Sequence, residues 1–379
     1  MEKKQLTDDS HAEMDEAIMK TSDDAIRAKV AAVQAGYYED PFVEILSRGK
    51  TQQYHVQPLI KRGTHARVAV MDRAIASFLR LCQSTTTDDT SLPQVVVLGA
   101  GKDSTFFRLI AGQLTTPTAD PVSIKWFEID HAEIVHEKVK IVTEASQFGA
   151  KVTKPMEGKD VCVFESAFEG VWKATPLSSL TLVAHDLRAL KGLEKKLGHG
   201  GFSSDSPTLF LMECFQMYLP EPSDQSLLRK LFGLNPNNCY IAIYEPILGN
   251  DPFGKIMEAN LTRVGVANPQ SCLNKTRTLQ QHMSKLAAAG FEIATACDMW
   301  NAFQTILTAE QRQRATTCEL VDEVEDFVLI MKHYCFAVAS ARKARYGAEF
   351  CEIGDKSLLG FRIGLCSHNS LSTDEGFRG

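Results

Sequence analysis

The segment from Val95 to Leu109 constrains the fold of this chain more than any other stretch of its sequence. It opens with the apolar run VVVL, which is typical of a buried β-strand. Gly99 and Gly101 follow, and two glycines let the backbone turn sharply and approach a ligand closely. Apolar residues at helical spacing come next, so the free N–H groups of a helix would face the turn. This order predicts a nucleoside-binding α/β unit.

A second apolar run, at residues 124–129, ends in an acidic residue, Asp130. In open α/β sheets an acid at this position accepts hydrogen bonds from the ribose hydroxyls of a bound nucleoside. Asp130 is therefore the predicted ribose-binding residue. Glu128 is the alternative, because strand alternation places both acids on the same side of the strand.

The glycine pattern also bears on which nucleoside is bound. A dinucleotide fingerprint has a third glycine where this chain has Ser104. S-adenosylmethionine carries no phosphate and tolerates a looser turn followed by an acid such as Asp103. The pattern favours S-adenosylmethionine over a dinucleotide, and a purely structural tight turn is the third interpretation.

Composition limits the other possibilities. With 379 residues, of which 44% are hydrophobic, the chain can bury a large core as one elaborated α/β domain. The net charge of −6, with dispersed Lys and Arg, argues against nucleic acid as the main partner. The ten cysteines form no C-x-x-C pair, which indicates reduced thiols and a cytoplasmic protein. No apolar run approaches the ~18 residues of a membrane span. We expect a monomer.

We expect three regions along the chain: a mobile N-terminus at 1–21, one methyltransferase-like domain at 22–343 and a poorly ordered tail at 344–379. Within the domain, residues 22–83 form a helical cap. Its first helix starts at the capping sequence SDD (22–24) and ends at Gly36, and its second helix covers residues 65–83.

The remaining pattern predicts a doubly wound, mostly parallel sheet. Residues 334–339 form an antiparallel edge strand after a helix at 320–332, and residues 199–207 form a flexible surface insertion. The other expected strands are at 95–98, 124–129, 161–164, 181–185, 208–213 and 239–244.

The blocks LGAGxDSxFxRL (98–109) and FEID (127–130) closely resemble those of the leucine carboxyl methyltransferase family. The resemblance extends over about residues 22–343 and implies a methyltransferase fold with inserted substrate-binding elements. It also implies S-adenosylmethionine as cofactor and methyl transfer to the C-terminal leucine carboxylate of type 2A protein phosphatase catalytic subunits. Further blocks agree in order: GYxxDP (36–41), ARV (66–68), DLR (186–188), PTL (207–209), EC (213–214), YE (244–245), FGxIM (253–257), GFE (290–292) and HYC (333–335).

The resemblance also implies roles for individual residues. Arg67 and Lys29 would lie near the carboxylate of the cofactor, where a guanidinium can form two parallel hydrogen bonds. Asp186 and Leu187 match the pair that contacts adenine. The alternatives are a surface arginine at 67, a solvated charge at 29 and a helix cap at 186.

Two further residues are candidates because of their position. Glu213 follows an apolar run, at the end of a central strand where open α/β sheets place their ligands. Tyr218 could line the substrate channel or pack in the core, and with Arg67 it forms the predicted catalytic pair. His131, His136, His185 and His333 have no partner at metal-ligand spacing, so we assign no metal.

A C-terminal carboxylate, with a reference pKa near ~3.5, is already ionised at pH 7 and needs no general base. Three alternatives stay open at this point. One is the family branch that methylates a tRNA wybutosine precursor and carries a C-terminal repeat domain, of which this sequence has no sign. The others are a small-molecule O-methyltransferase and a non-catalytic S-adenosylmethionine-binding module.

Overall fold

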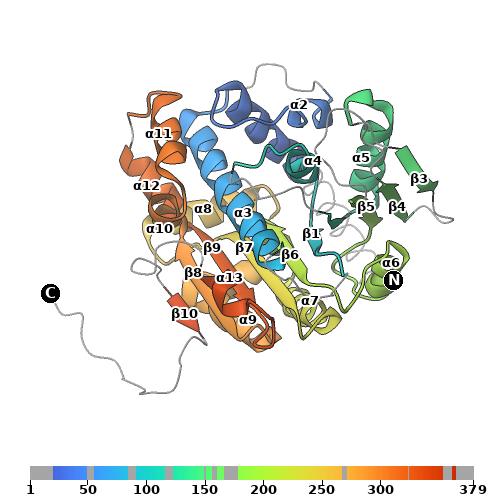
Figure 1. The fold of residues 1–379 in the computed structure, drawn as a ribbon. Coiled ribbons are helices and arrows are strands. Elements are labelled where there is room, and N and C mark those ends of the chain that lie inside the picture. Colours follow the sequence, from blue (N-terminus) through green and yellow to red (C-terminus); the bar gives the residue numbers. More distant parts are fainter. Residues whose placement is uncertain are drawn as a thin grey trace, which may run out of the picture.

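The structure is a computed structural model, and Figure 1 shows its fold. It describes residues 20–48, 55–83, 91–115, 123–148, 151–155, 160–165, 178–266, 271–322, 324–352 and 361–363.

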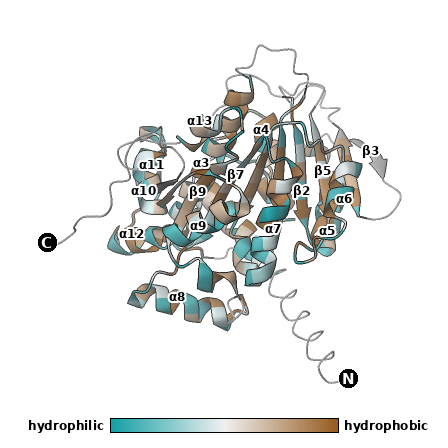
Figure 2. Ribbon diagram, turned by 90° about the horizontal axis from the view of Figure 1, so that it is seen from below, coloured by the Kyte–Doolittle hydropathy of each residue, from teal (hydrophilic) through white to brown (hydrophobic). Residues whose placement is uncertain are grey.

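These residues form a ten-stranded mixed sheet with the strand order β10-β8-β9-β7-β6-β1-β2-β5-β4-β3. Hydrophobic residues concentrate in its strands (Figure 2), which explains the burial on both faces. The strands are β1 (Gln94–Leu98), β2 (Lys125–Asp130), β3 (Lys151–Pro155), β4 (Val161–Glu165), β5 (Ser179–Ala184), β6 (Thr208–Glu213), β7 (Cys239–Pro246), β8 (Ile293–Asp298), β9 (Tyr334–Ser340) and β10 (Phe361–Ile363).

Helices cover the sheet on both sides, and α3 crosses β7 while α9 packs on β8. None of the helices in the described ranges is both long and apolar enough to cross a membrane. Besides the helical residues 20–34, the helices are α2 (Val43–Leu46), α3 (Pro58–Gln83), α4 (Thr105–Ile110), α5 (Ala132–Glu144), α6 (Leu193–His199), α7 (Glu221–Leu234), α8 (Pro252–Arg263), α9 (Leu279–Ala289), α10 (Met299–Thr305), α11 (Ala309–Thr317), α12 (Val324–Lys332) and α13 (Gly347–Cys351), with short 3₁₀ turns at η1 (Ser146–Phe148), η2 (Gln216–Tyr218) and η3 (Cys272–Lys275).

Five neighbouring strands, β5, β2, β1, β6 and β7, run parallel, as the alternation of strands and helices predicts. Their carboxyl ends therefore meet at one edge of the sheet, where open α/β folds bind their ligands. The predicted doubly wound, mostly parallel α/β sheet is thus confirmed in its central part.

The flanks of the sheet differ from the prediction. Residues 161–164 do form a strand, but β4 pairs antiparallel with both β5 and β3. β9 is antiparallel, yet it is not at the edge, because it lies between β7 and β8. The sequence did not suggest β8, whose alternation of Ala294, Ala296 and other small residues gives a weak apolar signal.

Both ends of the expected domain also need correction. The first helix already includes Lys20, so the segment SDD (22–24) lies inside it and does not cap it, although Gly36 ends it with a φ of +85°. α3 begins at Pro58, which fits the first turn of a helix. The ordered fold extends past residue 344, because α13 buries Phe350 and Cys351 against the sheet. Residues 1–19 and 367–379 lie outside the described residues.

Two smaller expectations can be compared with the contacts. The expected insertion at 199–207 begins with the last residue of α6 and continues in turns, which Gln94 holds through two hydrogen bonds of 2.8 Å to the backbone of Ser203. Every cysteine in the described part of the chain has a free thiol, including Cys162, Cys239 and Cys335 in the strands β4, β7 and β9.

Candidate active site

A cavity of about 160 Å³ lies at the carboxyl ends of the parallel strands. The loops after β1, β2, β5 and β6 supply its floor, while the first helix and α3 enclose it. The cavity brings together all the residues that the sequence predicted for the site: Lys29, Arg67, Gly99, Gly101, Asp130, Asp186, Leu187, Glu213 and Tyr218.

The turn after β1 requires its two glycines. Gly99 and Gly101 have φ values of +64° and +54°, a region that other residues rarely adopt. A Cβ atom on Gly99 would lie 2.3 Å from Cδ2 of Phe215, so any side chain at this position would clash with the Phe215 ring. The bare backbone of this turn can therefore approach a bound nucleoside closely.

Asp130 supports the turn and faces the cavity. Its Oδ2 accepts a hydrogen bond of 2.6 Å from the backbone N–H of Gly101, and its Oδ1 accepts one of 2.7 Å from that of His131. Burial raises the pKa of Asp130, although these two hydrogen bonds oppose the effect. Glu128 instead pairs with Lys138 away from the cavity lining. The geometry thus favours Asp130 over Glu128 as the ribose acid.

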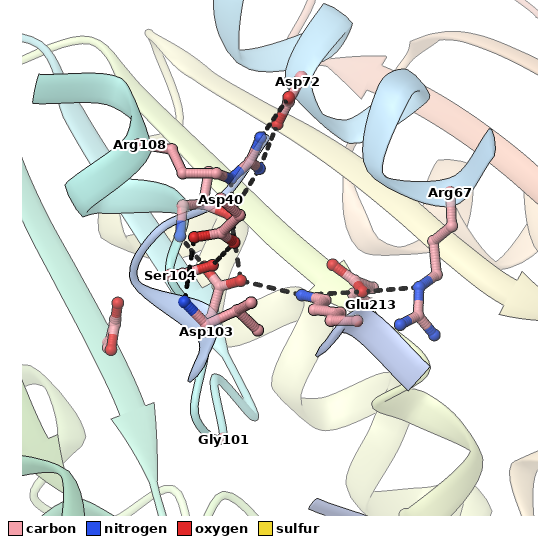
Figure 3. A network of polar contacts seen from close by, with 12 residues as sticks. Asp40, Arg67, Asp72, Gly101, Asp103, Ser104, Arg108 and Glu213 are labelled. Carbon is pink, nitrogen blue, oxygen red and sulfur yellow. Dashed lines mark hydrogen bonds and ion pairs between the residues drawn. The ribbon is translucent and has the colours of Figure 1, made fainter. Parts of the chain in front are cut away.

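A chain of charges crosses the cavity between the first helix, α3 and β6 (Figure 3). Nζ of Lys29 lies 3.0 Å from Oδ1 of Asp103 and 3.5 Å from Oε1 of Glu213. Nε of Arg67 lies 2.9 Å from the same Glu213 oxygen. Burial alone would lower the pKa of Lys29, but Glu213 and Asp103 raise it above its usual value, so the ammonium stays charged. Lys29 is a buried ion-pair partner, and the alternative of a solvated charge is wrong.

Arg67 retains binding capacity that the described residues do not use. Its guanidinium carbon lies 5.7 Å from the centre of the Tyr244 ring, and Nη2 is buried without a hydrogen-bond partner among those residues. A buried N–H donor without an acceptor is costly. The Nη2 atom is therefore suited to donate a hydrogen bond to a carboxylate oxygen of a ligand in the cavity.

Asp186 and Leu187 lie after β5, at the opposite wall from Arg67's helix. Oδ1 of Asp186 accepts hydrogen bonds of 2.9 Å from both the backbone N–H and Nε of Arg188. Burial raises the pKa of Asp186, but the bonds from Arg188 outweigh this effect and lower it. No helix begins here, since α6 starts at Leu193, so the alternative of a helix cap is wrong.

Asp103 and Phe215 also line the cavity, although neither was among the predicted site residues. The position of Asp103 directly after the glycine turn was the sequence feature that could have indicated its place in the cavity wall. Phe215 approaches the cavity only because the loop after β6 folds back toward Gly99, which no local pattern indicates.

Buried polar residues fix the glycine turn and α4 to α3 (Figure 3). Arg108 forms two hydrogen bonds of 2.8 Å to the two carboxylate oxygens of Asp72, and Ser104 donates one of 2.5 Å to Asp40. Thr115 donates two more to Asp72 through its backbone and its hydroxyl. Because Asp72 is on the same helix as Arg67, this cluster sets the distance between Arg67 and the turn.

Of the histidines considered for a metal site, His131 and His185 line the cavity, whereas His333 lies outside its lining. His333 is buried, with Nδ1 2.8 Å from the Leu329 carbonyl and Nε2 3.1 Å from Asp251. Within the described ranges, no group of three or more His, Cys, Asp or Glu residues is arranged to hold a metal ion.

The fold and the cavity are those of a nucleoside-binding α/β protein, and comparison with known proteins identifies it as a methyltransferase. Residues 17–232, more than half of the chain, match the family model "Leucine carboxyl methyltransferase". The chain belongs to the leucine carboxyl methyltransferase family.

Several curated relatives align along most of the chain. Leucine carboxyl methyltransferase 1 of Schizosaccharomyces pombe is 29% identical over 324 residues, covering 85% of this chain and 94% of the relative. The Bos taurus protein of the same name is 29% identical over 338 residues, covering 88% and 92%. Human tRNA wybutosine-synthesizing protein 4 is 28% identical over 328 residues, but the match covers 86% of this chain and only 44% of that protein. The predicted family and cofactor are thus confirmed.

Proposed function

We propose that this protein methylates the α-carboxylate of the C-terminal leucine of a type 2A protein phosphatase catalytic subunit, with formation of a methyl ester. Two relatives of similar length that carry the name leucine carboxyl methyltransferase 1 support the leucine carboxylate as acceptor. The phosphatase itself is the expectation drawn from the family resemblance of the sequence blocks.

The residues of the cavity fit S-adenosylmethionine. The glycine turn offers the bare backbone that a nucleoside needs, Asp130 offers an acceptor for ribose hydroxyls, and Asp186 and Leu187 lie where adenine would bind. Lys29 and Arg67 place two cations at the methionine end. When bound, the cofactor supplies an electrophilic methyl group on a sulfonium ion.

The observation that carries the proposal is the alignment of two relatives named leucine carboxyl methyltransferase 1 along most of the chain. The cavity is consistent with it. Nη2 of Arg67 is buried without a hydrogen-bond partner among the described residues, and the carboxylate of the cofactor's methionine would satisfy this donor. A cofactor held in this way leaves the leucine carboxylate to be aligned with the methyl group, and good alignment of reacting atoms contributes on the order of 7–11 kcal/mol.

Two titratable residues of the cavity lining, Tyr218 and Cys214, also suit an acceptor that needs no deprotonation. Burial raises the pKa of Tyr218 to about 12 and raises that of the Cys214 thiol. Both groups remain protonated near pH 7, so neither acts as a general base there. An ionised leucine carboxylate needs no base to accept the methyl group: an O–CH3 bond would form as the S–CH3 bond of the sulfonium breaks, the neutral thioether S-adenosylhomocysteine would leave, and the opposite charges would cancel.

The test is methyl transfer from radiolabelled S-adenosylmethionine to a purified type 2A phosphatase core. The expected product is an alkali-labile label at the C-terminus, and deletion of the terminal leucine should abolish it. A short peptide with the same C-terminus should be a poor substrate, because we expect the folded phosphatase surface to supply most of the binding.

Two controls distinguish the alternatives. Equal labelling of the phosphatase that lacks its leucine would reject the proposed acceptor. Efficient labelling of a wybutosine-precursor tRNA, with none of the phosphatase, would assign the chain to the activity named in its human relative. Binding of S-adenosylmethionine without transfer to either acceptor would favour a non-catalytic binding module.

A further inference from the structure

The loop that follows β6 carries much of the cavity wall, but its 3₁₀ turn η2 has no side-chain cap of its own. Glu213, Phe215 and Tyr218 all line the cavity; the first two precede the 3₁₀ turn η2, and Tyr218 is its last residue. Phe215 occupies the N-cap position of this turn and has no side chain that could cap it. Cys214, immediately before it, has a φ of +51°, which costs a non-glycine residue on the order of 1–2 kcal/mol.

The missing cap comes from the neighbouring strand. Glu213 and Tyr244 are paired in the register of β6 and β7, so the next residue, Glu245, lies directly behind the loop. Its Oε1 accepts hydrogen bonds of 2.7 Å from the backbone N–H groups of both Phe215 and Gln216. We propose that Glu245 is a positioning residue for methyl transfer: its carboxylate holds the loop 214–218 in the conformation that presents Glu213, Phe215 and Tyr218 to the cavity.

Several features show that this contact is specific to the loop. Glu245 is only 1% exposed, so its carboxylate is withdrawn from water to make these bonds. Its Oε2 has no hydrogen-bond partner in the described part of the chain. A buried carboxylate without an ion-pair partner is costly, and what it gains in this position is the two backbone N–H groups of the loop.

Contacts on the far side of the loop hold its other polar groups. The Gln216 side chain turns away from the cavity and donates a hydrogen bond of 2.9 Å to Asp224. Ser271 and Cys272 donate to the carbonyl oxygens of Met217 and Gln216 at 3.2 and 2.8 Å. These contacts fix the back of the loop, whereas Glu245 alone binds the two N–H groups at the start of η2 among the contacts of the described residues. Its removal would therefore free the end of the loop that adjoins Glu213.

Two substitutions separate hydrogen bonding from charge. Glu245→Asp keeps the charge but withdraws the carboxylate from the two N–H groups. Glu245→Gln keeps an acceptor oxygen at the same distance and loses the charge. If the hydrogen bonds position the loop, Glu245→Asp should lower kcat by roughly tenfold to a hundredfold and weaken S-adenosylmethionine binding, because small displacements near reacting atoms are costly. Glu245→Gln should stay within roughly threefold of the unaltered protein.

Amide hydrogen exchange gives a readout that needs no acceptor substrate. In Glu245→Asp, exchange at the amides of residues 215 and 216 should accelerate, while amides in the central strands keep their protection. Titration with S-adenosylmethionine completes the comparison. The inference rests on the methyl-transfer activity of the family, so these two measurements remain decisive if the phosphatase proves not to be the acceptor.

A matched control is Asp298→Ala. Asp298 also caps a helix from the end of a strand, through a hydrogen bond of 2.8 Å to the N–H of Asn301, but it lies outside the cavity lining. Its loss should cost about 1 kcal/mol of stability without a change in cofactor affinity or kcat. Unchanged exchange and cofactor affinity in Glu245→Asp would overturn the proposal. It would equally be overturned if Glu245→Gln were the more damaged of the two variants, since charge and not hydrogen bonding would then matter.

Discussion

Two loops at the ends of adjacent strands form the centre of the cavity, and they reach their conformations by different means. The turn after β1 uses glycine at both of its positive φ angles, at Gly99 and Gly101. The loop after β6 puts the non-glycine residue Cys214 in the same region and relies on Glu245, 31 positions further along the chain, to hold it. The first loop takes its positive φ angles from its own glycines and is supported by Asp130, whereas the second has no glycine there and depends on tertiary contacts.

This difference predicts how each loop responds to substitution. A change in the glycine turn should act on the backbone itself and damage cofactor binding directly. A change around the loop 214–218 should leave the fold in place and alter activity through the position of side chains. The two loops also touch, because the ring of Phe215 lies against Gly99.

The largest effect should come from Gly99→Ala. Alanine would have to adopt an unfavourable φ of +64°, and its methyl group would lie 2.3 Å from the Phe215 ring. Left-handed strain and overpacking together cost on the order of 2–5 kcal/mol. We expect loss of detectable S-adenosylmethionine binding in calorimetric titration, together with lower thermal stability.

Gly233→Ala is the matched control for this substitution. Gly233 lies within α7, and a Cβ atom there would meet nothing within 4 Å. Alanine should stabilise the helix by roughly 0.5–1 kcal/mol and leave binding unchanged. Normal cofactor affinity in Gly99→Ala would show that the turn does not approach the ligand.

Arg67→Lys tests the side of the cavity next to the second loop, where Arg67 of α3 pairs with Glu213. Lysine keeps the positive charge but loses the planar fork, including the unused Nη2 donor. We expect kcat to fall by roughly tenfold to a hundredfold while the thermal unfolding midpoint changes little. Arg73→Lys, on the same helix but outside the cavity lining, should be neutral. Equal turnover in Arg67→Lys and Arg73→Lys would show that Arg67 has only a structural role.

Asp130→Ala tests the support of the glycine turn. The substitution removes the acceptor of the Gly101 N–H as well as the proposed ribose acceptor. Loss of such a hydrogen bond should weaken S-adenosylmethionine binding by roughly 1–3 kcal/mol, measured by calorimetry. Asp130→Asn retains one acceptor oxygen, so its affinity for S-adenosylmethionine should lie between those of Asp130→Ala and the unaltered protein. If NADH bound tightly while S-adenosylmethionine gave no response, the assignment of the cofactor would be wrong.

The same difference explains how far the sequence could predict the structure. The parallel strands and the glycine turn were predictable, because a buried parallel strand is a continuous apolar run and a positive φ selects glycine. The interior position of β9 was not, since neighbouring strands in a sheet are chosen by long-range pairing. The strand β8, which lies on the far side of β9, was not predicted because its small residues give too weak an apolar pattern.

The site follows the same rule. Residues at the ends of predicted strands, such as Asp130 and Glu213, could be placed from the sequence because the parallel sheet brings strand ends together. The contact between Glu245 and the loop depends on the register of β6 against β7, which only the folded chain defines. An acid inside a strand of buried residues was nevertheless a visible signal, because such a residue is rarely buried without a partner.

The smallest expected effect concerns pH and distinguishes the second loop from the first. Burial raises the pKa of Glu245 from its ordinary value of 4.5 to about 7, against the opposing influence of the Gln216 and Phe215 N–H groups and of Lys285. The unfolded chain thus releases this proton near pH 4.5, whereas the folded protein holds it until about pH 7. Between these values the folded state binds more protons, so this residue makes the free energy of unfolding fall as pH rises.

Glu245→Gln removes that titration while it keeps the hydrogen-bond acceptor. The variant should therefore lose less stability than the unaltered protein between about pH 5 and pH 7, by a difference on the order of 1 kcal/mol. Denaturant unfolding at several pH values measures the two slopes. Glu128 also has a pKa raised to about 7 by burial, and it contributes equally to both proteins, so it cancels in the comparison. Identical slopes would mean that the Glu245 carboxylate is ionised throughout this range, with the loop N–H groups outweighing the cost of burial.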